Sequence, residues 1–224
     1  MSLYLLIDLI LIGFSALAII VFRKRLSTIL APTAMTASIL MLTTSSLSIV
    51  LVHFGVIGFN RSKLVGIHLI NIPLEEILFY FSFTCFTIVI YETAKIRFSS
   101  YNFKWANITL RIFASLAMLI LALTDHVGLY TLTVLLLIAV VVIVWGFFDD
   151  LNLIGITIIL CIIPYLLTRI YLIEEPDLAT IWHDDSQQHF FKLGTLPPEE
   201  ILDGIALIAA SIFTFEFIQK MRYK

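Results

Sequence analysis

The sequence predicts an all-α polytopic membrane protein with seven transmembrane helices, which form two parallel three-helix repeats joined by a connector helix. Three observations lead to this fold class. Hydrophobic residues make up 60% of the 224 residues and charged residues 13%, whereas soluble domains average about 45–50% and about 25%. Seven apolar stretches are long enough to cross a bilayer. A Pro-x-Glu-Glu motif also occurs twice, at residues 73–76 and 197–200.

Each predicted span is a nearly continuous apolar run, and a helix needs about 20 such residues to cross the hydrocarbon core. No strand-type alternation competes with these runs, and only helices and closed barrels satisfy all backbone groups in lipid. The boundary between the fourth and fifth spans depends on the short polar break at residues 124–126. The predicted spans are residues 3–22, 30–52, 73–94, 107–124, 129–148, 152–173 and 197–219.

The distribution of lysine and arginine predicts a cell-membrane protein with its N-terminus outside and its C-terminus in the cytoplasm. Positive residues gather in cytoplasmic loops, and in this orientation nine of them lie inside and three outside. The outer loop at residues 174–194 is acidic. Such a loop is usually a solvated connection, and a lid over a site is the alternative.

The composition excludes several classes of protein. A net charge of −2 and the lack of a basic run argue against a nucleic-acid partner. Cys85 and Cys161 both lie in apolar runs, so we expect neither a disulfide scaffold nor a cysteine-rich metal site. No glycine-rich nucleotide loop is present. We therefore expect no metal and no soluble cofactor.

The two Pro-x-Glu-Glu motifs begin the third and seventh spans, and the same offset of 124 residues places Glu92 on Glu216. An offset of four spans is even, so both halves would cross the membrane in the same direction. We predict a first repeat at residues 1–106, a connector helix at 107–128 and a second repeat at 129–224.

The glutamates of these motifs, Glu75, Glu76, Glu199 and Glu200, are the candidate catalytic residues. A capping role is the alternative, because proline and carboxylates both suit the first turn of a helix. A single motif would favour capping. Two motifs at matched positions, both at outer ends of spans, favour a function.

Arg169 and Asp203 lie at similar depth in the sixth and seventh spans. An arginine within a span is costly unless it is paired or reaches the interface. Two interpretations therefore stay open. Arg169 is either an interfacial arginine or a counter-ion that keeps one carboxylate ionised while another stays protonated.

A carboxylic acid at the edge of an apolar, aromatic-lined pocket suits acid catalysis on an alkene. Burial and a like-charged neighbour both favour its protonated form. One acid can then protonate a double bond, aromatic faces can stabilise the cation, and a second carboxylate can accept a proton. The aromatic stripe with Phe79, Tyr80 and Phe83 is a candidate substrate-binding wall, with core packing as the alternative.

Several segments resemble the membrane-embedded lycopene β-cyclases, the heterodimeric or fused carotenoid cyclases of bacteria, archaea and fungi. The resemblance spans nearly the whole chain and includes both predicted repeats. Its segments are residues 55–60, 66–67, 71–76 and 91–92 in the first half, and 163–165 and 194–200 in the second half.

This resemblance implies a redox-neutral cycloisomerase. Such an enzyme would protonate the terminal double bond of an acyclic lycopene end, let the next double bond attack the cation, and release a proton to leave a β-ionone ring. It implies a proton donor and a proton acceptor among the four motif glutamates, without deciding which is which. We place Arg169, Asp203, Asn71 and Asn60 in supporting positions. The expected partners are a lipophilic polyene, either lycopene or a related isoprenoid, and membrane lipid, and a homo-oligomer stays open.

The chain departs from the family pattern in three places. Many members carry Trp-Asp where this chain has Leu47-Ser48, Trp where Ile57 stands, and Asn-Gly where it has Arg169-Ile170. Another polyprenyl chain or a differently decorated carotenoid therefore stays open as the substrate.

Two functions from other classes also stay open. Repeats and intramembrane carboxylates occur in proton- or ion-coupled transporters, and a non-catalytic membrane subunit could use its glutamates only as caps. A cyclase should bring the Glu pairs to one lipid-accessible pocket. A transporter should have a polar route to both sides, and a subunit should point the pairs apart.

Overall fold

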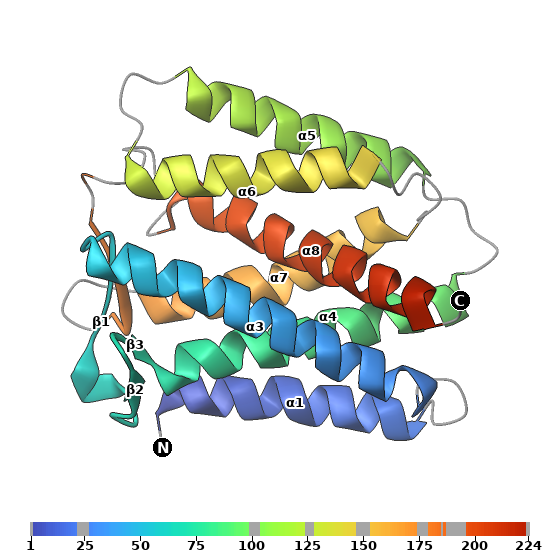
Figure 1. Cartoon of the computed structure of the whole chain (residues 1–224), viewed down its shortest axis with the longest axis horizontal. Coiled ribbons are helices and arrows are strands. Elements are labelled where there is room, and N and C mark those ends of the chain that lie inside the picture. The colour runs from blue at the N-terminus through green and yellow to red at the C-terminus, as the bar shows by residue number, and fades with distance from the viewer. Residues whose placement is uncertain are drawn as a thin grey trace.

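The computed structural model describes residues 2–21, 27–98, 104–123, 128–146, 153–173, 179–184, 186 and 196–222. These residues form seven α-helices that run side by side (Figure 1). They are α1 (Leu3–Val21), α3 (Leu30–His53), α4 (Leu74–Arg97), α5 (Lys104–Ala122), α6 (Leu129–Gly146), α7 (Ile154–Ile173) and α8 (Pro198–Arg222). Each predicted span coincides with one of these helices, and the ends differ by a few residues at most.

Five of the helices, α1, α3, α4, α7 and α8, are long and apolar enough to cross a membrane. Helix α6 adds a shorter apolar stretch, Leu129–Trp145. The polar break that we expected between the fourth and fifth spans, which includes Asp125 and His126, lies outside the described residues. The chain is therefore a mostly helical protein whose long apolar helices are compatible with a multi-pass membrane protein.

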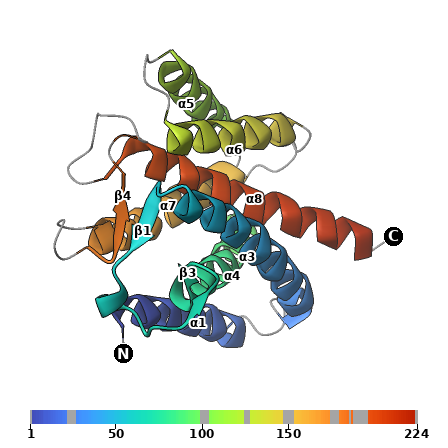
Figure 2. The same ribbon diagram turned by 60° about the vertical axis from the view of Figure 1, so that its left-hand side comes forward.

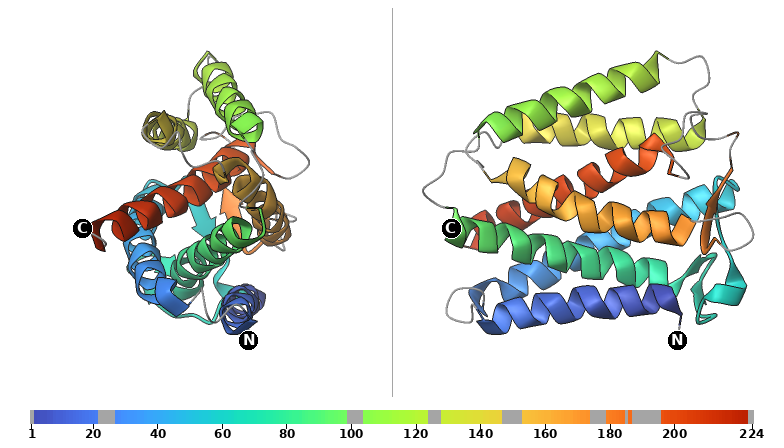
Figure 3. Two further views of the ribbon diagram at one scale, coloured as in Figure 1. Left: turned by 90° about the vertical axis from the view of Figure 1, so that its right-hand side faces the viewer. Right: turned by 180° about the vertical axis from the view of Figure 1, so that it is seen from behind.

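Helices α4 and α8 form the centre of the bundle, and most of their residues are buried. Helix α1 packs on α4, and α6 packs on α8, while α3 and α7 each contact both central helices. Helix α5 contacts α6 and α7. Seen from the end, α1 lies at one side of the bundle and α5 at the other (Figure 3). The outer helices turn many Leu, Ile and Val side chains outward, as expected for surfaces that face lipid.

The connection from α3 to α4 is not the plain loop that the sequence predicts, because it contains strands. Strand β1 (Ile57–Phe59) pairs with β4 (Ile181–His183) from the α7–α8 connection, and β2 (His68–Leu69) pairs with β3 (Ile72–Pro73). Two short 3₁₀ helices, η1 (Ser27–Ile29) and η2 (Arg61–Lys63), complete the described elements. Strands of two or three residues are too short to show an alternating pattern.

The β1–β4 pair joins the two halves of the chain at one end of the bundle, here called the strand end (Figure 2). The pairing is antiparallel, with Ile57 opposite His183, Gly58 opposite Trp182 and Phe59 opposite Ile181. The central pair, Gly58 and Trp182, is separated by 124 residues, which is also the offset between the two Glu pairs.

Both Glu pairs stand in the first turn of a helix, as the motifs predict. Pro73 is the extended residue just before α4, and Pro198 is the first residue of α8. Glu75, Glu76, Glu199 and Glu200 are all buried. A helix N-terminus carries partial positive charge, so these positions favour carboxylates, but burial of four of them requires further partners.

We predict that Gly58→Ala destabilises the protein. A Cβ at Gly58 would lie 2.0 Å from a ring atom of Trp182, so the strand pair must shift, at a cost of about 1–3 kcal/mol. The matched control is Gly13→Ala in α1, where a Cβ meets nothing within 4 Å. That change should stabilise the helix by roughly 0.5–1 kcal/mol. Thermal unfolding in detergent measures both.

The double variant Gly58→Ala/Trp182→Ala separates this clash from other effects. If the ring contact is the cause, the double variant is more stable than the sum of the two single effects predicts. Strict additivity of the two changes would contradict the steric explanation.

Candidate functional site

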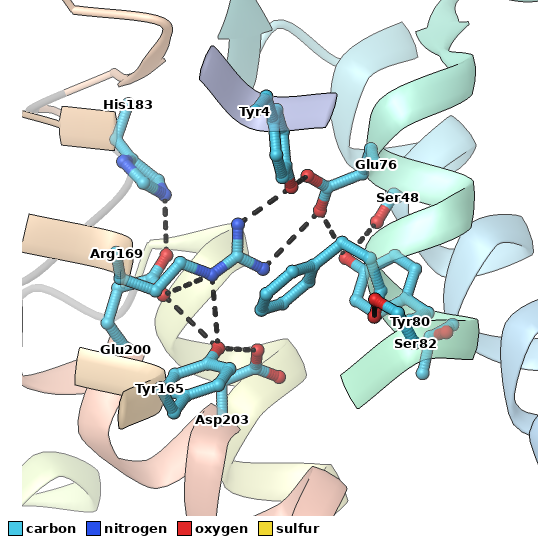
Figure 4. A network of polar contacts seen from close by, with 12 residues as sticks. Tyr4, Ser48, Glu76, Tyr80, Ser82, Tyr165, Arg169, His183, Glu200 and Asp203 are labelled. Atoms are coloured by element: carbon cyan, nitrogen blue, oxygen red, sulfur yellow. Dashed lines mark hydrogen bonds and ion pairs between the residues drawn. The ribbon is translucent and has the colours of Figure 1, made fainter. Parts of the chain in front are cut away.

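One glutamate from each motif reaches a common buried cluster, and the other does not. Glu76 on α4 and Glu200 on α8 lie on opposite sides of Arg169, which comes from α7 (Figure 4). Adjacent residues on a helix point about 100° apart, so both members of a pair cannot face the same point. We expected both Glu pairs to reach one pocket. Instead, one glutamate from each pair reaches the cluster.

Arg169 joins the two glutamates. Its Nη2 and Nη1 atoms lie 3.4 and 3.5 Å from Oε1 and Oε2 of Glu76, and its Nε lies 3.4 Å from Oε2 of Glu200. The residue is 4% exposed. Of the two interpretations left open by the sequence, the geometry supports a buried counter-ion over an interfacial arginine, because a buried charge persists only when it is paired.

Tyrosine hydroxyls complete the hydrogen bonding of both glutamates. Glu76 accepts from Tyr4 on α1 and from Tyr80, whose hydroxyl lies 2.6 Å from Oε1. The Tyr80 hydroxyl is also 2.8 Å from Ser48 Oγ. Glu200 accepts at 2.8 Å from Tyr130 on α6. The helix that packs beside each motif thus supplies one tyrosine to the cluster.

The second half adds three further side chains to the cluster, Tyr165, Asp203 and His183, that the first half lacks. Tyr165 donates to Oδ2 of Asp203 at 2.9 Å and accepts from Arg169 Nε at 3.3 Å. The Nε2 atom of His183, on β4, lies 3.0 Å from Oε1 of Glu200. Gly204 leaves room for the Tyr165 ring, because a Cβ there would lie 2.6 Å from it.

The aromatic stripe divides between the cluster and the core. The Arg169 guanidinium lies 4.8 Å from the centre of the Phe79 ring, a distance at which the ring face stabilises a cation. Phe79 in turn stacks on Phe83 at 5.5 Å, and both are buried. Of the three predicted wall residues, Tyr80 lines the cavity described below, and Phe79 and Phe83 pack behind Arg169.

Glu75 and Glu199 point away from Arg169 and bind neighbouring elements. Oε1 of Glu75 accepts from Ser2 Oγ at 3.0 Å and from the Val65 backbone N–H at 2.6 Å. Oε1 of Glu199 accepts from Thr131 Oγ1 at 2.6 Å. These contacts tie each motif to the start of the neighbouring helix. Glu75 and Glu199 therefore connect neighbouring elements, and neither lines the cavity described below.

The two predicted asparagines also lie outside the cluster. Oδ1 of Asn60 accepts from the backbone N–H and hydroxyl of Ser62 and so caps η2. Nδ2 of Asn71 donates to the Ile49 carbonyl at 3.1 Å. Both residues therefore form hydrogen bonds that stabilise the connection between α3 and α4 at the strand end.

A cavity opens beside the cluster, between α3, α6 and α8. Its charged and polar lining comes from Glu76, Arg169, His183, Glu200 and Asp203, with Tyr80 and Tyr130. Four of the five positions where the chain departs from the pattern of the resembling family, Leu47, Ser48, Ile57 and Arg169, line this same cavity, and Ile170 does not. Among the residues that the structure describes, no group of three His, Cys, Asp or Glu side chains is arranged to hold a metal ion.

The sequence did not identify Tyr4, Tyr130, Tyr165 or His183 as site residues. A signal existed for the first two, because tyrosine stands near the outer end of the first span of each predicted repeat. Tyr165 follows Pro164 in a segment already noted for its resemblance. His183 belongs to the acidic outer loop, and its inward position depends on the β1–β4 pairing. Residues 179–184 and 186 of that loop are described, and its other residues, including Glu174, Glu175, Asp177 and Asp185, lie outside the described part of the chain.

Comparison with known proteins identifies one family. The family described as lycopene cyclase matches the chain over residues 1–94 and 127–218. No curated protein and no solved structure matches the chain. The matched ranges contain every residue described above as part of the cluster.

We predict that Arg169→Met strongly destabilises the protein. Removing one partner of a buried ion pair leaves uncompensated charge, at a cost of about 3–5 kcal/mol. The control is Arg61→Met in the exposed helix η2, which should change stability little. Thermal unfolding in detergent measures the difference.

The double variant Arg169→Met/Glu76→Gln tests the cause of this loss. It should recover part of the lost stability, because it also removes one uncompensated carboxylate. If the double variant is less stable than Arg169→Met alone, the ion pair is not the source of the effect.

Proposed function

Because the chain belongs to the lycopene cyclase family, we propose that it cyclises the acyclic end of a carotenoid within the membrane. The observation that carries this proposal is the cavity between α3, α6 and α8, where a buried carboxyl cluster meets apolar side chains. Family membership indicates a carotenoid cyclase. The acid-initiated mechanism and the residue roles are our inference from the geometry of the cluster.

The proposed reaction needs only proton transfer. A carboxylic acid adds a proton to the terminal double bond of the polyene end, which leaves a tertiary cation. The neighbouring double bond attacks this cation, so that a carbon–carbon bond closes the ring and the charge moves along the chain. A carboxylate then removes a proton from an adjacent carbon. Atoms and electrons balance without an oxidant or a reductant, and the reaction is an isomerisation.

The charge balance of the cluster supports acid catalysis. Glu76, Glu200 and Asp203 supply three carboxyl groups, and Arg169 supplies one guanidinium. An excess of buried negative charge is unfavourable, so a proton held within the cluster is expected. We propose that Glu76 and Glu200 provide the acid and the base, with Arg169 and Asp203 setting the charge around them. Glu75 and Glu199 would hold the two helix ends in place.

Two features of the cavity suit a carbocation. The rings of Tyr80 and Tyr130 line it beside the carboxyl groups, and aromatic faces attract cations. Carboxylates that are already held in place by hydrogen bonds need no reorganisation when positive charge develops nearby. The aliphatic lining from Leu47, Ile57 and Leu207 would exclude water, which protects the cation from capture.

We also propose that the two halves are parallel repeats related by a two-fold axis along the membrane normal. The β1–β4 pair supports this arrangement, because it is centred on residues that share the repeat offset. The matching contacts of α1 with α4 and of α6 with α8 support it as well. In this proposal all seven helices cross the membrane, and the strand end with the N-terminus lies outside the cell.

The opposite end of the bundle favours a cyclase over a transporter. There Tyr91 donates to Glu216 at 2.8 Å, and Lys95 binds both Glu92 and Glu216. These contacts join α4 to α8. The cavity that carries the carboxyl cluster lies toward the strand end, and its apolar lining suits a lipophilic substrate better than an ion.

We expect Glu76→Gln and Glu200→Gln to lower ring formation about 100-fold or more, the scale of general acid–base catalysis. The variants would be expressed in a lycopene-accumulating bacterium, and the pigments separated by chromatography. Glu92→Gln, on α4 but at the opposite end, is the control and should retain cyclisation. Glu75→Gln and Glu199→Gln should lower yield only as far as they lower stability.

Deuterium supplies a readout independent of yield. In D2O, each ring formed by the wild type should carry one deuterium from the initial protonation. Normal cyclisation by the folded Glu76→Gln and Glu200→Gln proteins would contradict the acid assignment. A ring without deuterium would contradict the supply of the proton from groups that exchange with solvent.

A further inference from the structure

We propose that the polyene chain of the substrate binds in an apolar groove between α3, α6 and α8, and that its reacting end extends past Asp203 into the cavity of Glu76 and Glu200. This inference rests on the proposed cyclase function and adds the place of the long unreactive part of the molecule. The groove is defined here by Leu40, Leu47, Leu137, Val140, Ala206 and Ala210.

The groove continues directly from the cavity of the carboxyl cluster. Thr44, Leu47, Leu137, Asp203 and Leu207 line both spaces. One end of the combined space is therefore polar and lies at the strand end, and the other is apolar and extends along the helices. A carotenoid has the same division of properties during the reaction, with a cationic end and a neutral hydrocarbon chain.

The lining of α8 follows a single helix face. Asp203, Ala206, Leu207 and Ala210 are spaced at i, i+3, i+4 and i+7, and they run about 10 Å along the helix axis. The two alanines leave space for a ligand where larger side chains would fill it. Asp203 is the one charged residue in the described lining of the groove, so it marks the point where the hydrocarbon chain meets the reactive cluster.

The groove has direct access to lipid. Val140 on α6 lines it and is 59% exposed. Helix α3, which supplies the opposite wall, is long and apolar enough to cross a membrane. A hydrocarbon substrate dissolved in the bilayer could therefore enter sideways between α3 and α6 without passing through water.

The corresponding face on the other half of the chain is closed. At the repeat offset of 124 residues, Asp203 and Leu207 correspond to Phe79 and Phe83, and Ala210 corresponds to Phe86. Phe79 and Phe83 are stacked and buried, and Phe83 also packs on Phe86. Arg169 itself corresponds to Ser45. The two faces related by the repeat offset therefore differ in the described part of the chain, because phenylalanines fill one and the groove lies on the other. In this proposal each chain holds one polyene end at a time.

The test uses a substitution that narrows the groove and leaves every residue of the carboxyl cluster unchanged. Val140→Trp places a large ring at the lipid-facing edge of the groove. The matched control is Ile143→Trp, one turn further along α6, at a residue that is 63% exposed and does not line the groove. Both purified proteins receive two substrates in lipid nanodiscs. One is lycopene, and the other is a short acyclic isoprenoid that carries the same end group.

We expect Val140→Trp to lower kcat/KM for lycopene about tenfold, which corresponds to about 1.4 kcal/mol. The short substrate, which does not occupy the groove, should react at the wild-type rate. Ile143→Trp should convert both substrates as the wild type does. Equal conversion of lycopene by the two tryptophan variants would overturn the groove. An equal decrease in kcat/KM for both substrates in Val140→Trp would overturn it as well, since the substitution would then have impaired the carboxyl cluster.

Two further outcomes separate this inference from its premise. If the wild type converts neither substrate, the proposed function fails first. If a co-purified lipid acyl chain leaves the protein on Val140→Trp substitution while lycopene conversion is unchanged, the groove is a lipid site and the inference is wrong.

Discussion

The ion pairs of Arg169 with Glu76 and Glu200 are the interaction on which the rest of the structure depends. They join α4, α7 and α8 at one depth in an apolar bundle. Each charge is costly there without its partner, so the three helices must keep the register that brings them together. The strand pair above the cluster and the tyrosines around it follow from this requirement. They close the site at the strand end and supply the donors that an isolated ion pair would lack.

The hydrogen-bond and ion-pair partners distinguish Asp203 from the two glutamates. Every carboxylate oxygen of Glu76 and Glu200 has two described partners among Arg169, His183 and the tyrosine hydroxyls. The described partner of Asp203 is Tyr165, through Oδ2. The glutamates are therefore held in place by more contacts than Asp203, which stands at the junction of the cavity and the groove. In the proposed mechanism the two glutamates act as acid and base, and Asp203 contributes negative charge beside them.

The sequence predicts the helices well and the cluster only in part. Long apolar runs determine where helices lie, and the Pro-x-Glu-Glu motifs locate two helix starts correctly. Which glutamate of a pair points inward depends on the rotation of its helix about its own axis. This rotation cannot be predicted from the hydrophobic pattern of α4 and α8, because both helices are apolar on nearly all sides. Tyr4, Tyr130 and His183 reach the cluster through contacts between distant segments, and no local pattern encodes these contacts. The strands were missed because pairs of two or three residues leave no periodic signal.

The departures from the family pattern make physical sense together. Leu47, Ser48, Ile57 and Arg169 come from three elements, α3, β1 and α7, and line one cavity, so a change at one alters the surroundings of the others. Relative to the pattern that the resemblance implies, serine in place of aspartate at residue 48 removes one negative charge, and arginine in place of asparagine at residue 169 adds one positive charge. Both changes make the net charge of the cavity lining more positive. Three carboxyl groups still outnumber the single guanidinium in the described cluster, so the cavity keeps the capacity to balance a cationic intermediate. In the proposed mechanism that capacity resides in Glu76, Glu200 and Asp203, and Ser48 instead orients Tyr80 toward Glu76.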